Sequence, residues 1–163
     1  MEAIYIPQLT KAPNQTDRIT VHDYLPGLET LTPVQGEIRV THRGNYLEVE
    51  AQAEAIATLT CDRCLKQYNH RLKVDTTELI WLQEPDPNVD LDREVPFDEF
   101  VETLPPNGYF RPIDWLYEQL CLEIPQSKIC ADDCDGIATQ SQSTATVDRR
   151  WSSLEALRQQ LSN

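Results

Sequence analysis

Hydrophobic and polar residues alternate along the chain between residues 47 and 59. The odd positions are apolar, and most positions between them are Glu, Gln or Thr. A period of two over more than ten residues is typical of an antiparallel strand with one buried face. A similar stretch at 34–42 ends before Gly44-Asn45, which suits a turn, and the alternation resumes over 72–82. The pattern therefore predicts a sheet of long antiparallel strands.

A helical period follows further along the chain. Apolar residues recur at intervals of three and four, and these residues are Ile113, Leu116, Tyr117, Leu120, Cys121 and Ile124. Pro112 suits the first turn of a helix and Pro125 ends it, so one helix is predicted over 112–124. The strand over 47–59 is rich in alanine, whose small side chain needs a large neighbour, and this helix is the candidate. The predicted fold class is α+β.

The rest of the chain is assigned by composition. Residues 1–33 are predicted to be an irregular N-terminal segment because prolines interrupt every short apolar run. Residues 34–136 are predicted to form a single α+β domain. Residues 137–147 read as a polar linker, and residues 148–163 as a C-terminal helix with Trp151 on its apolar face.

Two shorter segments lie inside the predicted domain. Residues 84–95 are rich in Pro and Asp, so we expect a mobile loop. Residues 97–104 fit either a strand or a helix, and an edge strand is the preferred interpretation.

Charge is distributed unevenly over the 163 residues, which carry a formal net charge of −13. Residues 84–135 hold 14 Asp or Glu against 3 Lys or Arg. This balance argues against a broad surface that follows nucleic-acid phosphates, because such affinity grows with the number of phosphates neutralised. It suits solubility or a basic partner, such as a ribosomal protein.

The five cysteines include two closely spaced pairs. Cys61 and Cys64 form a CxxC, and Cys130 and Cys134 form a CxxxC. A structural zinc site needs four soft ligands, usually supplied as two short pairs from different elements, so the four cysteines are candidate Zn²⁺ ligands. Cys121 lies on the apolar stripe of the predicted helix and is expected to be a buried small hydrophobe.

Two other interpretations of the cysteine pairs stay open. They are free thiols that hold no metal, or a redox pair, although a redox CxxC usually opens a helix and here a strand pattern precedes it. A disulfide is disfavoured because nothing in the sequence indicates secretion, and cytosolic thiols are kept reduced.

Four basic residues lie on or beside the CxxC, at the end of the predicted strand pair. They are Arg63, Lys66, Arg71 and Lys73, with Asp62 as the single acid among residues 61–73. They are candidate RNA-phosphate contacts. The alternative is that they pair with neighbouring acids.

No enzyme, membrane segment or small-molecule site is predicted. The three histidines are scattered, no Ser/His/Asp or HExxH spacing occurs, and the five glycines form no phosphate-binding loop. The apolar runs are shorter than a membrane span, and the start of the chain does not resemble a signal peptide. A cytoplasmic protein is expected.

Three segments together resemble a known family. They are "CDRCLKQY", "NGYFRPIDWLYEQLCLEIPQSKICADDCDGI" and "VDRRWSSLEAL", and their order and spacing are similar to those of the large ribosomal RNA accumulation proteins called YceD. The resemblance covers about residues 34–161. In it, Cys61 and Cys64 match the first cysteine pair of the family, and Cys130 and Cys134 match the second.

The resemblance implies a non-enzymatic ribosome-biogenesis factor that supports accumulation or processing of large-subunit ribosomal RNA. Its partner would be that RNA or a pre-ribosomal particle. The competing hypothesis is an acidic adaptor or chaperone for a basic ribosomal protein. The chain departs from the family where many relatives carry a further CPxCG knuckle, because it has only "GIATQSQSTATV" there. Any metal would therefore be held by the four paired cysteines.

Overall fold

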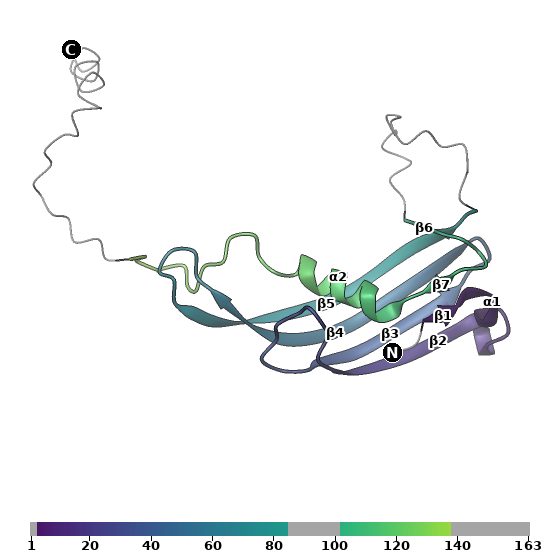
Figure 1. Cartoon of the computed structure of the whole chain (residues 1–163), viewed down its shortest axis with the longest axis horizontal. Coiled ribbons are helices and arrows are strands. Elements are labelled where there is room, and N and C mark those ends of the chain that lie inside the picture. Colours follow the sequence, from purple (N-terminus) through teal and green to yellow (C-terminus); the bar gives the residue numbers. More distant parts are fainter. Residues whose placement is uncertain (1–2, 85–101, 138–163) are drawn as a thin grey trace, which may run out of the picture.

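A five-stranded sheet dominates the computed structural model, which describes residues 3–84 and 102–137 (Figure 1). Its strands lie in the order β2-β3-β4-β5-β6, and their bounds are β2 Thr16–Asp23, β3 Val34–His42, β4 Tyr46–Thr60, β5 Gln67–Leu82 and β6 Thr103–Leu104. Strands β2 to β5 pair antiparallel, whereas the short β6 runs parallel to β5. The predicted antiparallel sheet is confirmed.

Strands β4 and β5 form a long hairpin. Their register runs from Tyr46 opposite Trp81 to Thr60 opposite Gln67. Residues 61–66 join the two strands, so the CxxC lies at the end of a hairpin, as predicted. β5 begins at Gln67, directly after this connection.

One face of the sheet is buried, and the other is open in the described part of the chain. In β4 every odd position from Leu47 to Leu59 is buried, and the positions between them are half-buried or exposed. Adjacent residues of a strand point to opposite faces, so the alternation in the sequence translates directly into one core face. The prediction from the alternating pattern is confirmed.

Helix α2, Pro112–Leu122, lies along the core face of the sheet (Figure 1). Leu116 and Leu120 of the predicted apolar stripe are buried there, and its other four members are half-buried. Trp115, which the stripe did not include, is buried as well. The helix starts at Pro112, whose ring fixes φ near the helical value, and it ends two residues earlier than predicted. None of the helices in residues 3–84 and 102–137 is long and apolar enough to span a membrane.

The N-terminal segment is more ordered than predicted. Residues 1–33 were expected to be irregular, but they include β1 (Ile4–Tyr5), α1 (Ile6–Leu9) and the eight-residue edge strand β2. β1 pairs with β7 (Tyr109–Phe110) in a second, two-stranded sheet. The prolines do not prevent this order, because they fall in the first turn of α1, at the start of a 3-10 turn and in the connection from β2 to β3.

Several predictions fall wholly or partly on residues outside the described ranges. These are the loop 84–95 beyond Glu84, the linker 137–147 beyond Ile137 and the C-terminal helix 148–163. Of the predicted edge strand 97–104, the described end, Thr103–Leu104, is a strand at the edge of the sheet.

Candidate metal centre

Two loops bring four cysteines together at the end of the β4–β5 hairpin. The first loop, residues 61–66, carries Cys61 and Cys64, and the second loop, residues 125–136 after α2, carries Cys130 and Cys134. Their four Sγ atoms all lie within 4.8 Å of one another. In Figure 1 the chain after α2 runs back to the hairpin end, which explains how residues so distant in sequence meet.

Backbone hydrogen bonds close the first loop into a tight turn. The Leu65 N–H donates to the Cys61 carbonyl at 2.9 Å, and the Cys61 N–H donates to the Lys66 carbonyl at 2.9 Å. Leu65 adopts a φ of 61°, in the left-handed region. This turn directs both sulfur atoms of the first pair toward the second loop.

Hydrogen bonds also join the two loops to each other. The Asp62 N–H donates to the Lys128 carbonyl, and the Lys128 N–H donates to the Asp62 carboxylate, both at 2.7 Å. The Cys130 N–H donates to the Cys61 Sγ at 3.4 Å. Hydrogen bonds of the backbone therefore hold the two loops together, and with them the sulfur cluster.

The sulfur positions fit a tetrahedral metal. Sγ–Sγ distances are 3.8 Å for Cys61–Cys134 and 3.7 Å for Cys64–Cys130. A tetrahedral zinc ion with Zn–S bonds of about 2.3 Å separates its sulfur ligands by about 3.8 Å. Four thiolates are also the donor set of closed structural zinc sites. Distance and donor chemistry thus both suit a metal such as zinc.

The pKa values of the clustered thiols also suit a bound cation. The pKa of Cys61 falls to about 6, mainly because the backbone N–H of Cys64 stabilises its thiolate, and burial opposes this effect. The pKa of Cys130 rises to about 12, because it shares hydrogen bonds with Cys134 and the other two thiols. Cys61 loses its proton readily, and the negative charge beside Cys130 then makes loss of a second proton unfavourable. Four thiolates therefore require a cation between them.

The redox and disulfide interpretations of the CxxC have less support in this geometry. Cys61 and Cys64 lie in a turn between two strands, whereas a thioredoxin-type pair opens a helix. No disulfide joins them, because the Sγ–Sγ distances are well beyond the roughly 2.05 Å of a disulfide bond.

Cys121 lies apart from the cluster, as predicted. It is half-buried on α2 and packs against the hydrophobic core, so it is less enclosed than expected. It is the natural control residue for experiments on the other four.

The basic residues of the first loop are exposed beside the sulfur cluster. The Arg63 guanidinium lies 3.5 Å from the Cys134 carbonyl oxygen, which ties its side chain to the second loop. Within the described residues, Lys66 forms no ion pair. Both side chains point into solvent at the hairpin end.

The two basic residues of β5 lie further away, on the open face of the sheet. Arg71 pairs with Glu54 of β4, with 3.3 Å between guanidinium and carboxylate. Lys73 is opposite Glu54 in the strand register, and it too is exposed. The sequence-based alternative, pairing with neighbouring acids, therefore describes Arg71.

Three further arginines share the open face, and the sequence analysis missed them. They form cross-strand ion pairs: Arg18 with Glu37 at 3.7 Å, Arg39 with Glu50 at 2.5 Å, and Arg43 with Glu48 at 2.6 Å. The alternation alone could have placed Arg18 and Arg39 on this face, because each falls at an outward position of its strand, whereas Arg43 lies in the turn between β3 and β4. Their paired carboxylates leave this part of the face close to neutral.

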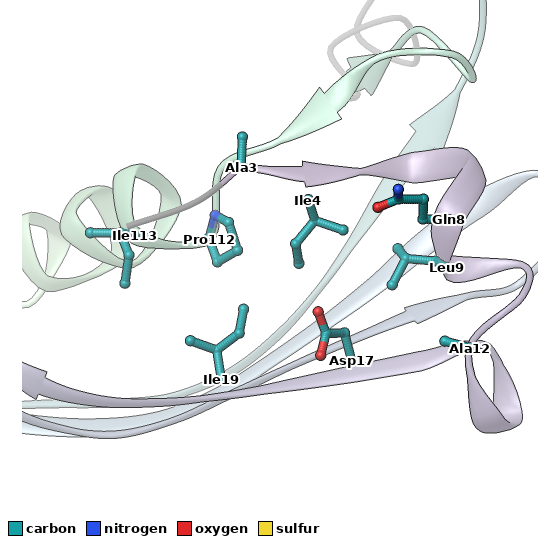
Figure 2. Close-up of a pocket in the computed structure, with 9 residues that line it drawn as sticks. All are labelled: Ala3, Ile4, Gln8, Leu9, Ala12, Asp17, Ile19, Pro112 and Ile113. Atoms are coloured by element: carbon teal, nitrogen blue, oxygen red, sulfur yellow. The ribbon is translucent and has the colours of Figure 1, made fainter.

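A separate groove lies at the opposite end of the sheet, between α1, β2 and the start of α2 (Figure 2). Its volume is about 470 Å³, and most of its lining is apolar, including Ile4, Ile19 and Ile113. Among the described residues that line it, Asp17 alone is titratable.

Comparison with known proteins identifies one family. The family described as "Large ribosomal RNA subunit accumulation protein YceD" matches residues 49–158. No curated protein and no solved structure matches the chain. The matched region runs from β4 through α2 and includes all four clustered cysteines. Because the match covers more than half of the chain, this protein belongs to the YceD family, whose description links it to large-subunit ribosomal RNA.

Proposed function

We propose that this protein is a non-enzymatic ribosome-biogenesis factor that supports accumulation of large-subunit ribosomal RNA. The family match carries the proposal. We further propose that it works in the cytoplasm by binding a component of the pre-ribosomal particle, and that the cysteine end, residues 61–66 with 125–136, is the binding site.

The metal at the cysteine end would be zinc, with a structural role. Four protein ligands would close the coordination shell and leave no position for a substrate. Zinc would neutralise the developing thiolates and hold the two loops in one arrangement. Binding to a preformed surface loses less entropy than binding to a mobile one, so the ion would support recognition without chemistry.

Zinc binding predicts a clear result from cysteine variants. Cys64→Ser or Cys130→Ser should remove the metal and loosen residues 125–136, while the sheet stays folded because its core lies under α2. Elemental analysis measures zinc per chain, and hydrogen exchange of the backbone amides reports whether residues 125–136 loosen while the sheet stays protected. Cys121→Ala should keep its zinc. A parent protein purified without chelator that holds less than about 0.2 zinc per chain would contradict the proposal.

RNA phosphate is one candidate ligand of the cysteine end. Arg63 and Lys66 are exposed there, and the hydrogen-bonded turn fixes the backbone that carries them. If both contact phosphates, Arg63→Gln with Lys66→Gln should reduce the salt dependence of RNA binding by about 1 unit of slope per lost contact. Titrations of both proteins at several salt concentrations measure this. Parallel lines with equal affinity would exclude these two residues as phosphate contacts.

A basic ribosomal protein is the second candidate, and the charges near the cysteines favour it. Asp132, Asp133 and Asp135 are exposed on the second loop, and a zinc ion with four thiolates would carry a further formal charge of about −2. Arg71 is already paired with Glu54. Such a surface attracts cations more strongly than phosphates.

One experiment separates the two candidates. The immobilised full-length protein is offered either a protein-free large-subunit ribosomal RNA transcript or RNA-free proteins extracted from purified large subunits. Retention of the transcript alone supports direct RNA binding, and retention of ribosomal proteins alone supports the adaptor. Retention of neither would contradict the proposed function.

A further inference from the structure

Leu65 lies in the first loop, after Cys64, and is 63% exposed. A single exposed leucine usually needs no explanation, since folded proteins carry many apolar surface atoms. Its backbone sets Leu65 apart from the other exposed apolar residues.

The Leu65 backbone has a φ of 61°, a conformation that favours glycine. In this region the Cβ of an L-residue approaches the following carbonyl, so leucine costs free energy that glycine would not. The described glycines with positive φ, such as Gly27 and Gly44, adopt similar angles without this cost. Leu65 thus gains little from burial and is unfavourable for its own turn.

The loop nevertheless holds Leu65 in one position. Its N–H is bonded to the Cys61 carbonyl, and the turn closes through the Cys61–Lys66 hydrogen bond. The two loops are joined through Asp62 and Lys128. An exposed apolar side chain on a strained but fixed backbone has the properties of a binding anchor. Little conformational entropy would be lost when a partner binds, because the backbone is already ordered.

The charges around Leu65 indicate the kind of partner. The two loops together carry four carboxylates, Asp62, Asp132, Asp133 and Asp135, against the three basic residues Arg63, Lys66 and Lys128, and Asp132, Asp133 and Asp135 are exposed. The whole chain is also strongly acidic, at −13. An apolar anchor beside carboxylates is complementary to a protein segment that combines an apolar residue with Lys or Arg.

We infer that Leu65 is an apolar anchor that docks a basic protein segment at the cysteine end. This inference rests on the proposed function and names its partner class: a basic protein of the large-subunit precursor. The aspartates of the second loop would attract the segment, and Leu65 would contribute the contact that excludes water.

Leu65→Gly tests the inference because it should weaken binding without lowering the stability of the fold. Glycine relieves the strain, so the melting temperature should stay the same or rise, and zinc per chain should not change. Affinity for RNA-free large-subunit ribosomal proteins should fall about tenfold. The matched control is Leu122→Ala, since Leu122 is also an exposed leucine, 77%, but lies at the end of α2 with ordinary helical geometry. This control should bind as the parent does.

Each outcome has a distinct meaning. Unchanged affinity of Leu65→Gly in a parent that binds the proteins would overturn the anchor and leave the proposed function intact. A fall in melting temperature of several degrees would also overturn it, because Leu65 would then be a packing residue. If the parent binds only the RNA transcript, the basic-protein partner is wrong. If it binds neither component, the proposed function fails as well.

Discussion

At the scale of single residues, Gly36 shows how closely the strands approach each other. It lies in β3 between Val21 of β2 and Ala53 of β4. A Cβ at this position would clash with the Gln52 carbonyl oxygen and lie 2.5 Å from the Ala53 Cα. The clash is with backbone, which cannot move aside as a flexible side chain can. Glycine is therefore required here by space alone.

Gly36→Ala should accordingly lower the free energy of unfolding by about 1–3 kcal/mol through overpacking. Chemical denaturation with urea measures the change. Gln35→Ala is the control, since Gln35 is the exposed neighbour in the same strand, and it should stay within about 0.5 kcal/mol of the parent. Equal effects from both substitutions would show that the space at Gly36 is not limiting.

At the scale of elements, a partly buried polar contact fixes helix α2 on the sheet. The Trp115 indole N–H donates to the Glu78 carboxylate at 2.5 Å, and the Gln119 amide donates to the same oxygen at 3.1 Å. Trp115 is only 3% exposed, whereas Glu78 is half-buried. Glu78 points to the core face of β5 and anchors the helix from which the second loop departs.

Glu78→Ala should cost about 1–3 kcal/mol of unfolding free energy, because it leaves the buried Trp115 N–H unsatisfied. Glu78→Gln retains an acceptor oxygen and should cost less. Thermal or urea unfolding followed by tryptophan fluorescence reports the change. The exposed Glu118 on α2 provides the control, and Glu118→Ala should be nearly silent. If Glu78→Ala is silent too, the contact does not fix the helix.

At the scale of the whole molecule, the sheet has one face in the core and one face covered with cross-strand ion pairs. Arg39 and Glu50 form the shortest pair on the open face of the described chain. Their hydrogen bond and opposite charge lower the pKa of Glu50 below its usual range. The folded state therefore binds this proton less readily than the unfolded state does.

The Arg39–Glu50 pair stabilises the folded state more at neutral pH than at acidic pH. The stabilising contribution of the pair is present above the usual glutamate pKa, about 4.3, and is lost as the pH falls through the lowered pKa. Arg39→Gln should therefore lower the melting temperature by a few degrees at most at pH 7, and the difference from the parent should shrink below about pH 4. Arg18→Gln, in a longer and more exposed pair, should show a smaller effect. A difference that grows on acidification would contradict this assignment.

Long periodic segments were predictable from the sequence, and short ones were not. The 15-residue alternation in β4 and the three-turn stripe of α2 repeat their signal often enough to define one face each. β2 has only Ile19 and Val21 as inward apolar residues, with charged neighbours, and its order comes from pairing with β3. A strand whose stability depends on its neighbour leaves little trace in its own residues.

The sequence by itself determined the face each long strand buries, the position of α2 along the chain and the two cysteine pairs, because these depend on local spacing. Only the tertiary structure decided that the two pairs meet in one cluster, that Arg71 pairs with Glu54, and that Leu65 is held at a positive φ. These features depend on contacts between segments up to 73 residues apart, such as Cys61 and Cys134. Contacts at that separation are set by how α2 packs on the sheet and where the chain leaves it, which no local pattern specifies.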